Sequence, residues 1–262
     1  MKLTPHTIAA LAAHLEQAEL NATAVPKITD NHPDMDWDDA YAIQDLIRAA
    51  KAARGVPVAG LKMGLTSAAK IQQMGVKEPI YGFLNGDHEF RSGADIATDQ
   101  LIHPKVEAEI GFVLNRPLSG PGCHIGDVLA ATAYVVAAVE VIDSRYEHFK
   151  FDLKSVIADN TSAARYVLGT SYHDAVGLDL RNLGIVLRKN GEVAATASGA
   201  AVLGHPAASV AMLANMLGAR GREIPAGVLI MTGGATEAIR VEAGDRVAVD
   251  YQWLGSVSMQ FT

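Results

Sequence analysis

Short apolar runs of the kind that form β-strands recur along the sequence from Val56 to the C-terminus, with glycine-rich turns between them. Asn190-Gly191 lies inside one such run, as expected for a tight β-hairpin. The predicted helices, 67–74, 126–133, 149–158 and 206–217, do not alternate regularly with the strands, which argues against a TIM barrel or a doubly wound sheet. We therefore predict an α+β fold built on a curled mixed β-sheet or β-roll. The predicted strands cover residues 56–63, 101–114, 134–143, 164–169, 184–198, 228–232, 238–241, 246–251 and 255–261.

Two helices are predicted ahead of this β-rich part. Thr4-Pro5 is typical of an N-cap followed by proline at the first helical position, and the apolar periodicity continues to about Leu20. A second helix begins near Asp36, whose side chain can cap it, and ends at Gly55. The two form an N-terminal helical layer. We divide the chain into a helical segment, 1–55, and a domain that carries the candidate site, 56–262.

The composition limits the compartment and the partners. A net charge of −7 argues against binding to nucleic acid. The single cysteine, Cys123, excludes an intramolecular disulfide and fits a reducing compartment. We find no uninterrupted apolar segment long enough to span a bilayer, and the N-terminus lacks the apolar core of a signal peptide. We expect a cytoplasmic protein without a membrane or nucleic-acid partner, whose apolar content is compatible with a homo-oligomer.

Glu107 and Glu109 lie two residues apart in a run of otherwise apolar residues. Side chains at this spacing share one face of a strand. A third acid, Glu140, interrupts the apolar run 134–142. Burying such carboxylates is costly unless a cation compensates them, and hard divalent ions prefer oxygen ligands. These residues predict a Mg²⁺ or Mn²⁺ site. The alternative is that the acids lie on a solvated face.

Lys62 lies in an apolar, glycine-containing run. It is either a residue of an edge strand whose ammonium group reaches solvent or a buried cation that faces anions. Arg145 follows the strand that contains Glu140, where it could bind a carboxylate with two hydrogen bonds or pair on the surface with a nearby acid. Asp159-Asn160 and Thr232-Gly233 follow a helix and a strand; each pair could contact a ligand or serve only in a turn.

Five segments taken together resemble the hydratase/decarboxylase family of the fumarylacetoacetate hydrolase fold superfamily. They are Gly-Leu-Lys62-Met-Gly-Leu-Thr-Ser67, Pro-Lys-Val-Glu107-Ala-Glu109, the segment 139–146, Ala-Asp159-Asn160 and Leu-Gly-His205-Pro. The resemblance covers nearly the whole chain. The run Phe-Lys-Phe-Asp-Leu before Lys154 is more similar to the decarboxylase branch than to the hydratase branch.

The resemblance implies a lyase of catechol meta-cleavage that decarboxylates (3E)-2-oxohex-3-enedioate and associates with 2-oxopent-4-enoate hydratase. It implies metal ligation by Glu107, Glu109 and Glu140, with Lys62 as the active-site lysine. We expect Arg145 and Asp159 to join Lys62 in catalysis, Arg145 as a candidate for the distal carboxylate. The expected substrate-binding residues are Ser67, Asn160, Thr232 and Gly233. The alternatives are a hydratase that shares the same metal and lysine, and a non-catalytic partner subunit.

Overall fold

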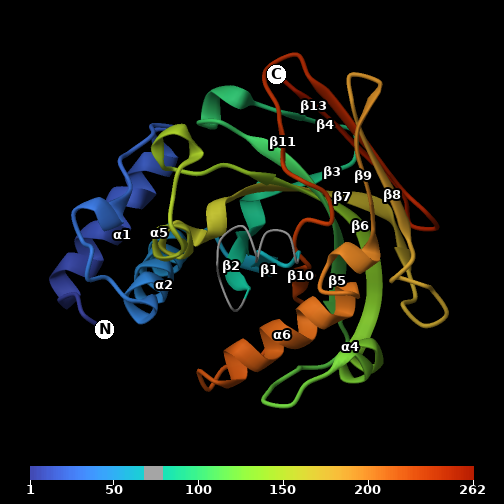
Figure 1. Cartoon of the computed structure of the whole chain (residues 1–262), viewed down its shortest axis with the longest axis horizontal. Helices are drawn as coiled ribbons and strands as arrows, with labels where there is room; N and C mark the ends of the chain where they lie inside the picture. The colour runs from blue at the N-terminus through green and yellow to red at the C-terminus, as the bar shows by residue number, and fades with distance from the viewer. Residues whose placement is uncertain (68–78) are drawn as a thin grey trace.

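The computed structural model describes residues 1–67 and 79–262, and its strands form two sheets (Figure 1). The larger sheet has eight strands in the order β2-β1-β10-β5-β6-β7-β3, with β11 also paired to β5. It is mixed, because β1 pairs in parallel with β10 and β3 with β7 while the other pairs are antiparallel. Its strands are β1 (Val58–Gly64), β2 (Ile80–Asn85), β3 (Glu89–Arg91), β5 (Lys105–Leu114), β6 (Thr132–Ile142), β7 (Ala163–His173), β10 (Leu229–Met231) and β11 (Ile239–Arg240).

The second sheet has five strands in the order β4-β13-β12-β8-β9, and β13 packs against β6 and β7 of the larger sheet. Its hairpin between β8 and β9 turns at Asn190 and Gly191, whose φ angles of 54° and 90° are those of a type I′ turn and confirm the prediction. Its strands are β4 (Ala94–Ile96), β8 (Gly184–Lys189), β9 (Glu192–Ser198), β12 (Arg246–Tyr251) and β13 (Gly255–Phe261).

Helices α1 (Pro5–Leu20), α2 (Trp37–Ala53) and α5 (Leu153–Ala158) gather on one side of the larger sheet (Figure 1). The predicted caps are confirmed: the Thr4 hydroxyl accepts from the backbone N–H of Thr7, and Asp36 forms a capping box with Asp39. Helices α4 (Ile125–Ala131) and α6 (Pro206–Gly218) pack together elsewhere. Single 3₁₀ turns are Ile28–Asp30, Gly86–His88, Thr98–Gln100, Glu147–Phe149, Asn160–Ser162 and Gly199–Ala201.

Several predicted boundaries were wrong. The helix expected over 149–158 begins only at Leu153, because the Asp152 carboxylate accepts from the backbone N–H of Ser155 at 3.0 Å and caps the helix there. Strand β2 was not predicted, since all six of its residues are buried and it shows no alternation. Strands β3 and β4 were also missed, because three residues give too short a pattern. The helix predicted over 67–74 lies almost wholly outside the described residues.

One described stretch, Gly199–Gly218, is long and apolar enough to cross a membrane by length and composition, contrary to our expectation. Half of it is buried inside the protein. Within this stretch α6 packs against α4 and β1, and the apolar side chains Val210, Leu213 and Leu217 are almost fully buried. These contacts are those of a core helix.

Candidate active site

Three buried acids project from one face of the strand pair β5 and β6. The antiparallel register places Glu107 directly opposite Glu140, and Glu109 opposite Ala138. Opposed residues in such a pair share a face, as do residues two apart in a strand, so all three carboxylates point the same way. Glu107 is 6% exposed, Glu109 0% and Glu140 1%. The alternative of a solvated acidic face is therefore excluded.

The electrostatics of this acid cluster (Glu107, Glu109 and Glu140) favour a cation. Burial and the charge of Glu140 together raise the pKa of Glu109 well above its ordinary value. Burial also raises the pKa of Glu140, although Lys62 acts in the opposite direction. Glu109 Oε1 and both Glu140 oxygens accept no hydrogen bond from the described residues. Buried oxygens in this condition are costly, and a bound cation would compensate them.

Among the described residues, Lys62 is a cation in contact with the acid cluster. Its Nζ forms an ion pair with Glu140 Oε2 at 3.0 Å and donates a hydrogen bond to the Thr161 carbonyl oxygen at 3.0 Å. Lys62 is 3% exposed, and β1 lies between β2 and β10, so the edge-strand alternative is wrong. In the described ranges, no group of three Asp, Glu, His or Cys side chains has metal-holding geometry as the side chains stand.

The loop after β10 contacts the acid cluster. The backbone N–H of Gly233 donates to Glu109 Oε2 at 2.7 Å, so its partner is a carboxylate of the protein itself. A Cβ on Gly234 would lie 2.0 Å from Glu107 Oε2, which explains why glycine is needed there. The Thr232 hydroxyl donates to the Ile110 carbonyl at 3.0 Å. Thr232 and Gly233 thus hold the strand and the acid in place, and substrate binding by these two residues stays a prediction.

A cavity of about 260 Å³ opens beside the acid cluster. Lys62, Glu107 and Thr161 are among the residues that line it, and apolar side chains make up most of the rest. Sequence reasoning missed Lys105, although it precedes Glu107 by two residues on the same face of β5. It also missed the two aromatic rings of the decarboxylase-like run. The lining residues are Lys62, Met63, Gly64, Leu65, Ile80, Lys105, Glu107, Ile142, Phe149, Phe151, Val156, Thr161, Ser162 and Ala238.

Arg145 and Asp159 are brought together, but with each other rather than with the cavity. The Arg145 Nε–H donates to Asp159 Oδ1, and its Nη1 donates to the carbonyl oxygens of Asp143 and Ala163 at 2.6 and 3.0 Å. Both residues are at most 2% exposed, and neither lines the cavity. Burial outweighs the attraction of Arg145 and raises the pKa of Asp159 to about 7. These contacts give both residues internal partners, and a direct action of Arg145 and Asp159 on the substrate stays a prediction.

Asn160 is also committed to the protein itself. Its side-chain amide donates to the Phe83 carbonyl and accepts from the Phe83 N–H, both at 2.9 Å, as a neighbouring strand would. This clamp fixes the left-handed turn Asn160–Ser162, which presents the Thr161 carbonyl to Lys62. These contacts give Asn160 a positioning role, and substrate binding by Asn160 stays a prediction. Ser67 is half-buried after β1 and is not among the residues that line the cavity.

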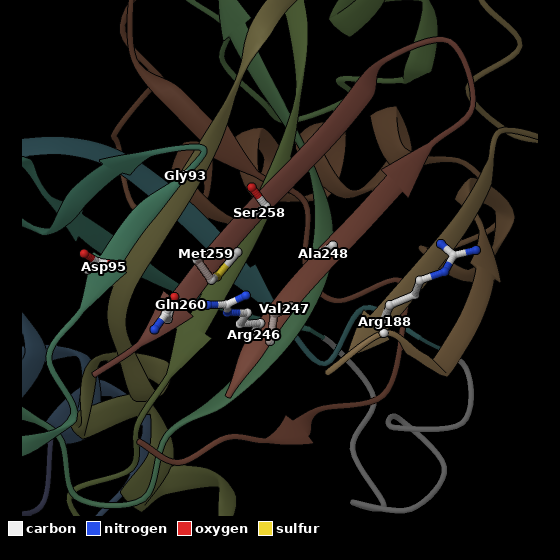
Figure 2. Close-up of a pocket in the computed structure, with 10 residues that line it drawn as sticks. Gly93, Asp95, Arg188, Arg246, Val247, Ala248, Ser258, Met259 and Gln260 are labelled. Carbon is white, nitrogen blue, oxygen red and sulfur yellow. The ribbon is translucent and has the colours of Figure 1, made fainter. Parts of the chain in front are cut away.

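A second depression, of about 350 Å³, lies on the five-stranded sheet (Figure 2). Its two arginines, Arg188 and Arg246, lie well apart, and Arg188 is paired with Asp250. Its other lining residues include no cluster of buried acids. The convergence of buried charge favours the cavity beside the acid cluster as the active site.

Comparison with known proteins agrees with this architecture. Residues 61–262 match the family model of the fumarylacetoacetate (FAA) hydrolase C-terminal domain. The chain belongs to the fumarylacetoacetate hydrolase family. Within this family it is 58% identical over 259 residues to a 4-oxalocrotonate decarboxylase of Pseudomonas sp. strain CF600. The aligned region covers 99% of this chain and 98% of that protein. A 2-hydroxyhexa-2,4-dienoate hydratase of Comamonas testosteroni is 38% identical over 250 residues, covering 95% of each chain.

Solved structures of the family give the same result. The chain superimposes with a TM-score of 0.97 and 55% identity, over 99% of both chains, on 4-oxalocrotonate decarboxylase from Pseudomonas putida G7 in complex with magnesium and adipate. The same enzyme with calcium and acetate gives a TM-score of 0.96. These similarities confirm the predicted family, the curled-sheet fold and the N-terminal helices.

The internal role of Arg145 can be tested by its effect on stability. Arg145→Met leaves the Asp159 carboxyl buried without its partner, so we expect the free energy of unfolding to fall by about 3–5 kcal/mol. Urea denaturation measures this, with Arg116→Met on the exposed surface as the matched control. Unchanged stability combined with weaker substrate binding would instead support the original prediction that Arg145 contacts the substrate.

Proposed function

We propose that this protein is a divalent-metal-dependent carboxy-lyase that converts (3E)-2-oxohex-3-enedioate to 2-oxopent-4-enoate and CO₂, by way of 2-hydroxypenta-2,4-dienoate. The observation that carries the proposal is the acid cluster, three buried carboxylates on one strand face with Lys62 beside them. The high identity to 4-oxalocrotonate decarboxylases over the whole chain supports decarboxylation, since the hydratases of the family are more distant.

The acid cluster fits a hard divalent cation. Its donors are carboxylate oxygens only, and three of them accept no hydrogen bond within the described chain. Glu107, Glu109 and Glu140 would hold the ion, and Mg²⁺ or Mn²⁺ suits such a donor set. When bound, the ion supplies a Lewis acid that polarises the 2-oxo group of the substrate.

The substrate chemistry determines what the protein's own residues must do. When the C5–C6 bond breaks, its electrons form the C4–C5 double bond and shift through the conjugated chain onto the C2 oxygen, and C6 leaves as CO₂. The acid cluster would hold the ion that orients the 2-oxo acid end of the substrate, and the apolar wall excludes water from the reacting atoms. One proton is then required, at the C2 oxygen for the dienol or at C3 for the 2-oxo product.

Lys62 is the residue placed to supply that proton. Its Nζ lines the cavity and lies next to the acid cluster, where its charge also offsets part of the negative charge brought by a dianionic substrate. The carbonyl oxygen of Thr161 orients the ammonium group. Lys62 therefore acts as a general acid and, in the resting protein, as the counterion of Glu140.

Several features of the cellular setting belong to the same proposal. We place the protein in the cytoplasm, in the meta-cleavage breakdown of aromatic compounds. We also propose a homo-oligomer that associates with 2-oxopent-4-enoate hydratase, which would use the unstable dienol directly. Co-purification of the two proteins, followed by sedimentation of the complex, would test it.

Metal dependence gives the first prediction for this function. We expect Glu109→Gln to weaken Mg²⁺ binding by at least about 10-fold, because changes even outside the ligand shell commonly cost that much. Calorimetric titration measures the affinity, and Glu192→Gln on the exposed edge of β9 is the matched control.

Turnover should follow the metal affinity. Purified protein with 2-oxohex-3-enedioate and Mg²⁺ should release one CO₂ for each substrate lost, chelator should stop the release, and added Mg²⁺ should restore it. Full activity after chelation would contradict the metal assignment. Hydration of 2-hydroxypenta-2,4-dienoate without CO₂ release from the dicarboxylate would show that the protein is a hydratase.

Lys62 gives a second prediction. Lys62→Met should lower kcat by about 10²–10⁴-fold, the range for loss of a general acid. The same variant should bind Mg²⁺ at least as tightly as the wild type, because the ammonium group no longer competes for Glu140. Stopped-flow assay and calorimetric titration measure the two effects. A variant with wild-type kcat would remove Lys62 from the mechanism.

A further inference from the structure

Lys105 is a second lysine of the active-site cavity, and the mechanism above gives it no role. It lies two residues before Glu107 on the same face of β5, about 6–7 Å further along the strand. It is half-buried, and it forms no ion pair with any described residue. Lys62, by contrast, is already paired with Glu140. Lys105 is therefore the cavity cation whose charge no carboxylate of the described chain neutralises through an ion pair.

Aromatic side chains fix the position of this ammonium group. Lys105 Nζ lies 3.8 Å from the centroid of the Phe149 ring, a cation–π contact. Phe149 packs in turn against Phe151 and His103, with centroid separations of 5.8 and 5.2 Å. The backbone of Phe149 has a φ of 58°, in the left-handed region that non-glycine residues rarely adopt. The fold thus holds the ring under Lys105 at the expense of local strain.

A second cation lies beside Lys105. Strand β11 pairs antiparallel with β5 and places Arg240 directly opposite Lys105, so the two side chains share a face. Ala238, two residues earlier, lines the cavity on that same face. Like charges directly opposite each other destabilise a sheet, and an anion between or near them relieves the repulsion. This end of the cavity is therefore suited to an anion.

We propose that Lys105, seated on the ring of Phe149, binds the distal carboxylate of the substrate and so selects dicarboxylates over monocarboxylates. The inference rests on the proposed function, which places the 2-oxo acid end at the acid cluster. The separation of Glu107 and Lys105 along β5 is comparable with the length of a six-carbon chain. Arg240 adds to the positive electrostatic potential at the same end of the cavity. The aromatic surface beside the carboxylate provides an apolar environment in which loss of its charge as CO₂ is favourable.

Binding of two matched ligands tests this assignment. The probes are 2-oxohexanedioate and 2-oxohexanoate, which differ only in the distal carboxylate, titrated by calorimetry into Mg²⁺-loaded protein. Lys105→Met should weaken the binding of 2-oxohexanedioate by about 10- to 100-fold, which is the contribution of a hydrogen bond to a charged group. The affinity for 2-oxohexanoate should stay within about threefold of the wild-type value. Lys105→Arg should retain most of the preference. Lys150→Met, which removes a lysine from an exposed position of the same region, should change neither affinity.

Each outcome separates the two proposals. Equal weakening of both ligands by Lys105→Met, or no change in either, would overturn the role of Lys105. Failure of the wild-type protein to bind either 2-oxo acid would instead overturn the proposed function. Steady-state kinetics give an independent readout: Lys105→Met should raise KM for the dicarboxylate more than it lowers kcat. A loss confined to kcat would show that Lys105 does not serve in binding.

Discussion

The direct opposition of Glu107 and Glu140 across a buried strand pair is the constraint on which the rest of the site depends. Two carboxylates in these positions repel each other, and Glu109 adds a third negative group on the same face. Water cannot solvate them, because all three are nearly inaccessible. Such an arrangement needs compensation, either by protonation, which the raised pKa values of Glu109 and Glu140 favour, or by a cation. Lys62 is the cation beside Glu140 in the resting protein, and a bound divalent ion would take its place there.

The curled sheet makes this compensation possible. Lys62 is on β1 and Glu140 on β6, and two further strands separate them in the sheet order. Curvature brings the lysine across the concave face to within 3.0 Å of the acid. The left-handed turn that Asn160 clamps supplies the Thr161 carbonyl, and the internal pair of Arg145 with Asp159 braces the neighbouring loop. Residues that do not line the cavity thus determine the position of those that do.

The sequence predicted the acids and the lysine because each interrupts an apolar strand, which is a local pattern. It also predicted the hairpin at Asn190-Gly191 and the caps at Thr4 and Asp36, which depend on a few neighbouring residues. The partners of Arg145 and Asn160 could not be found in this way. Both side chains bond to backbone groups that only the tertiary fold brings near. Lys105 escaped notice because a lysine at the start of a strand usually faces solvent.

Crystals grown with Mn²⁺ and measured for anomalous scattering test the central claim most directly. The account predicts a single strong peak ligated by Glu107, Glu109 and Glu140 together, with Lys62 Nζ moved away from Glu140 Oε2. A peak at another position, or no peak while Lys62 remains paired with Glu140, would contradict the claim that the acid cluster is the metal site.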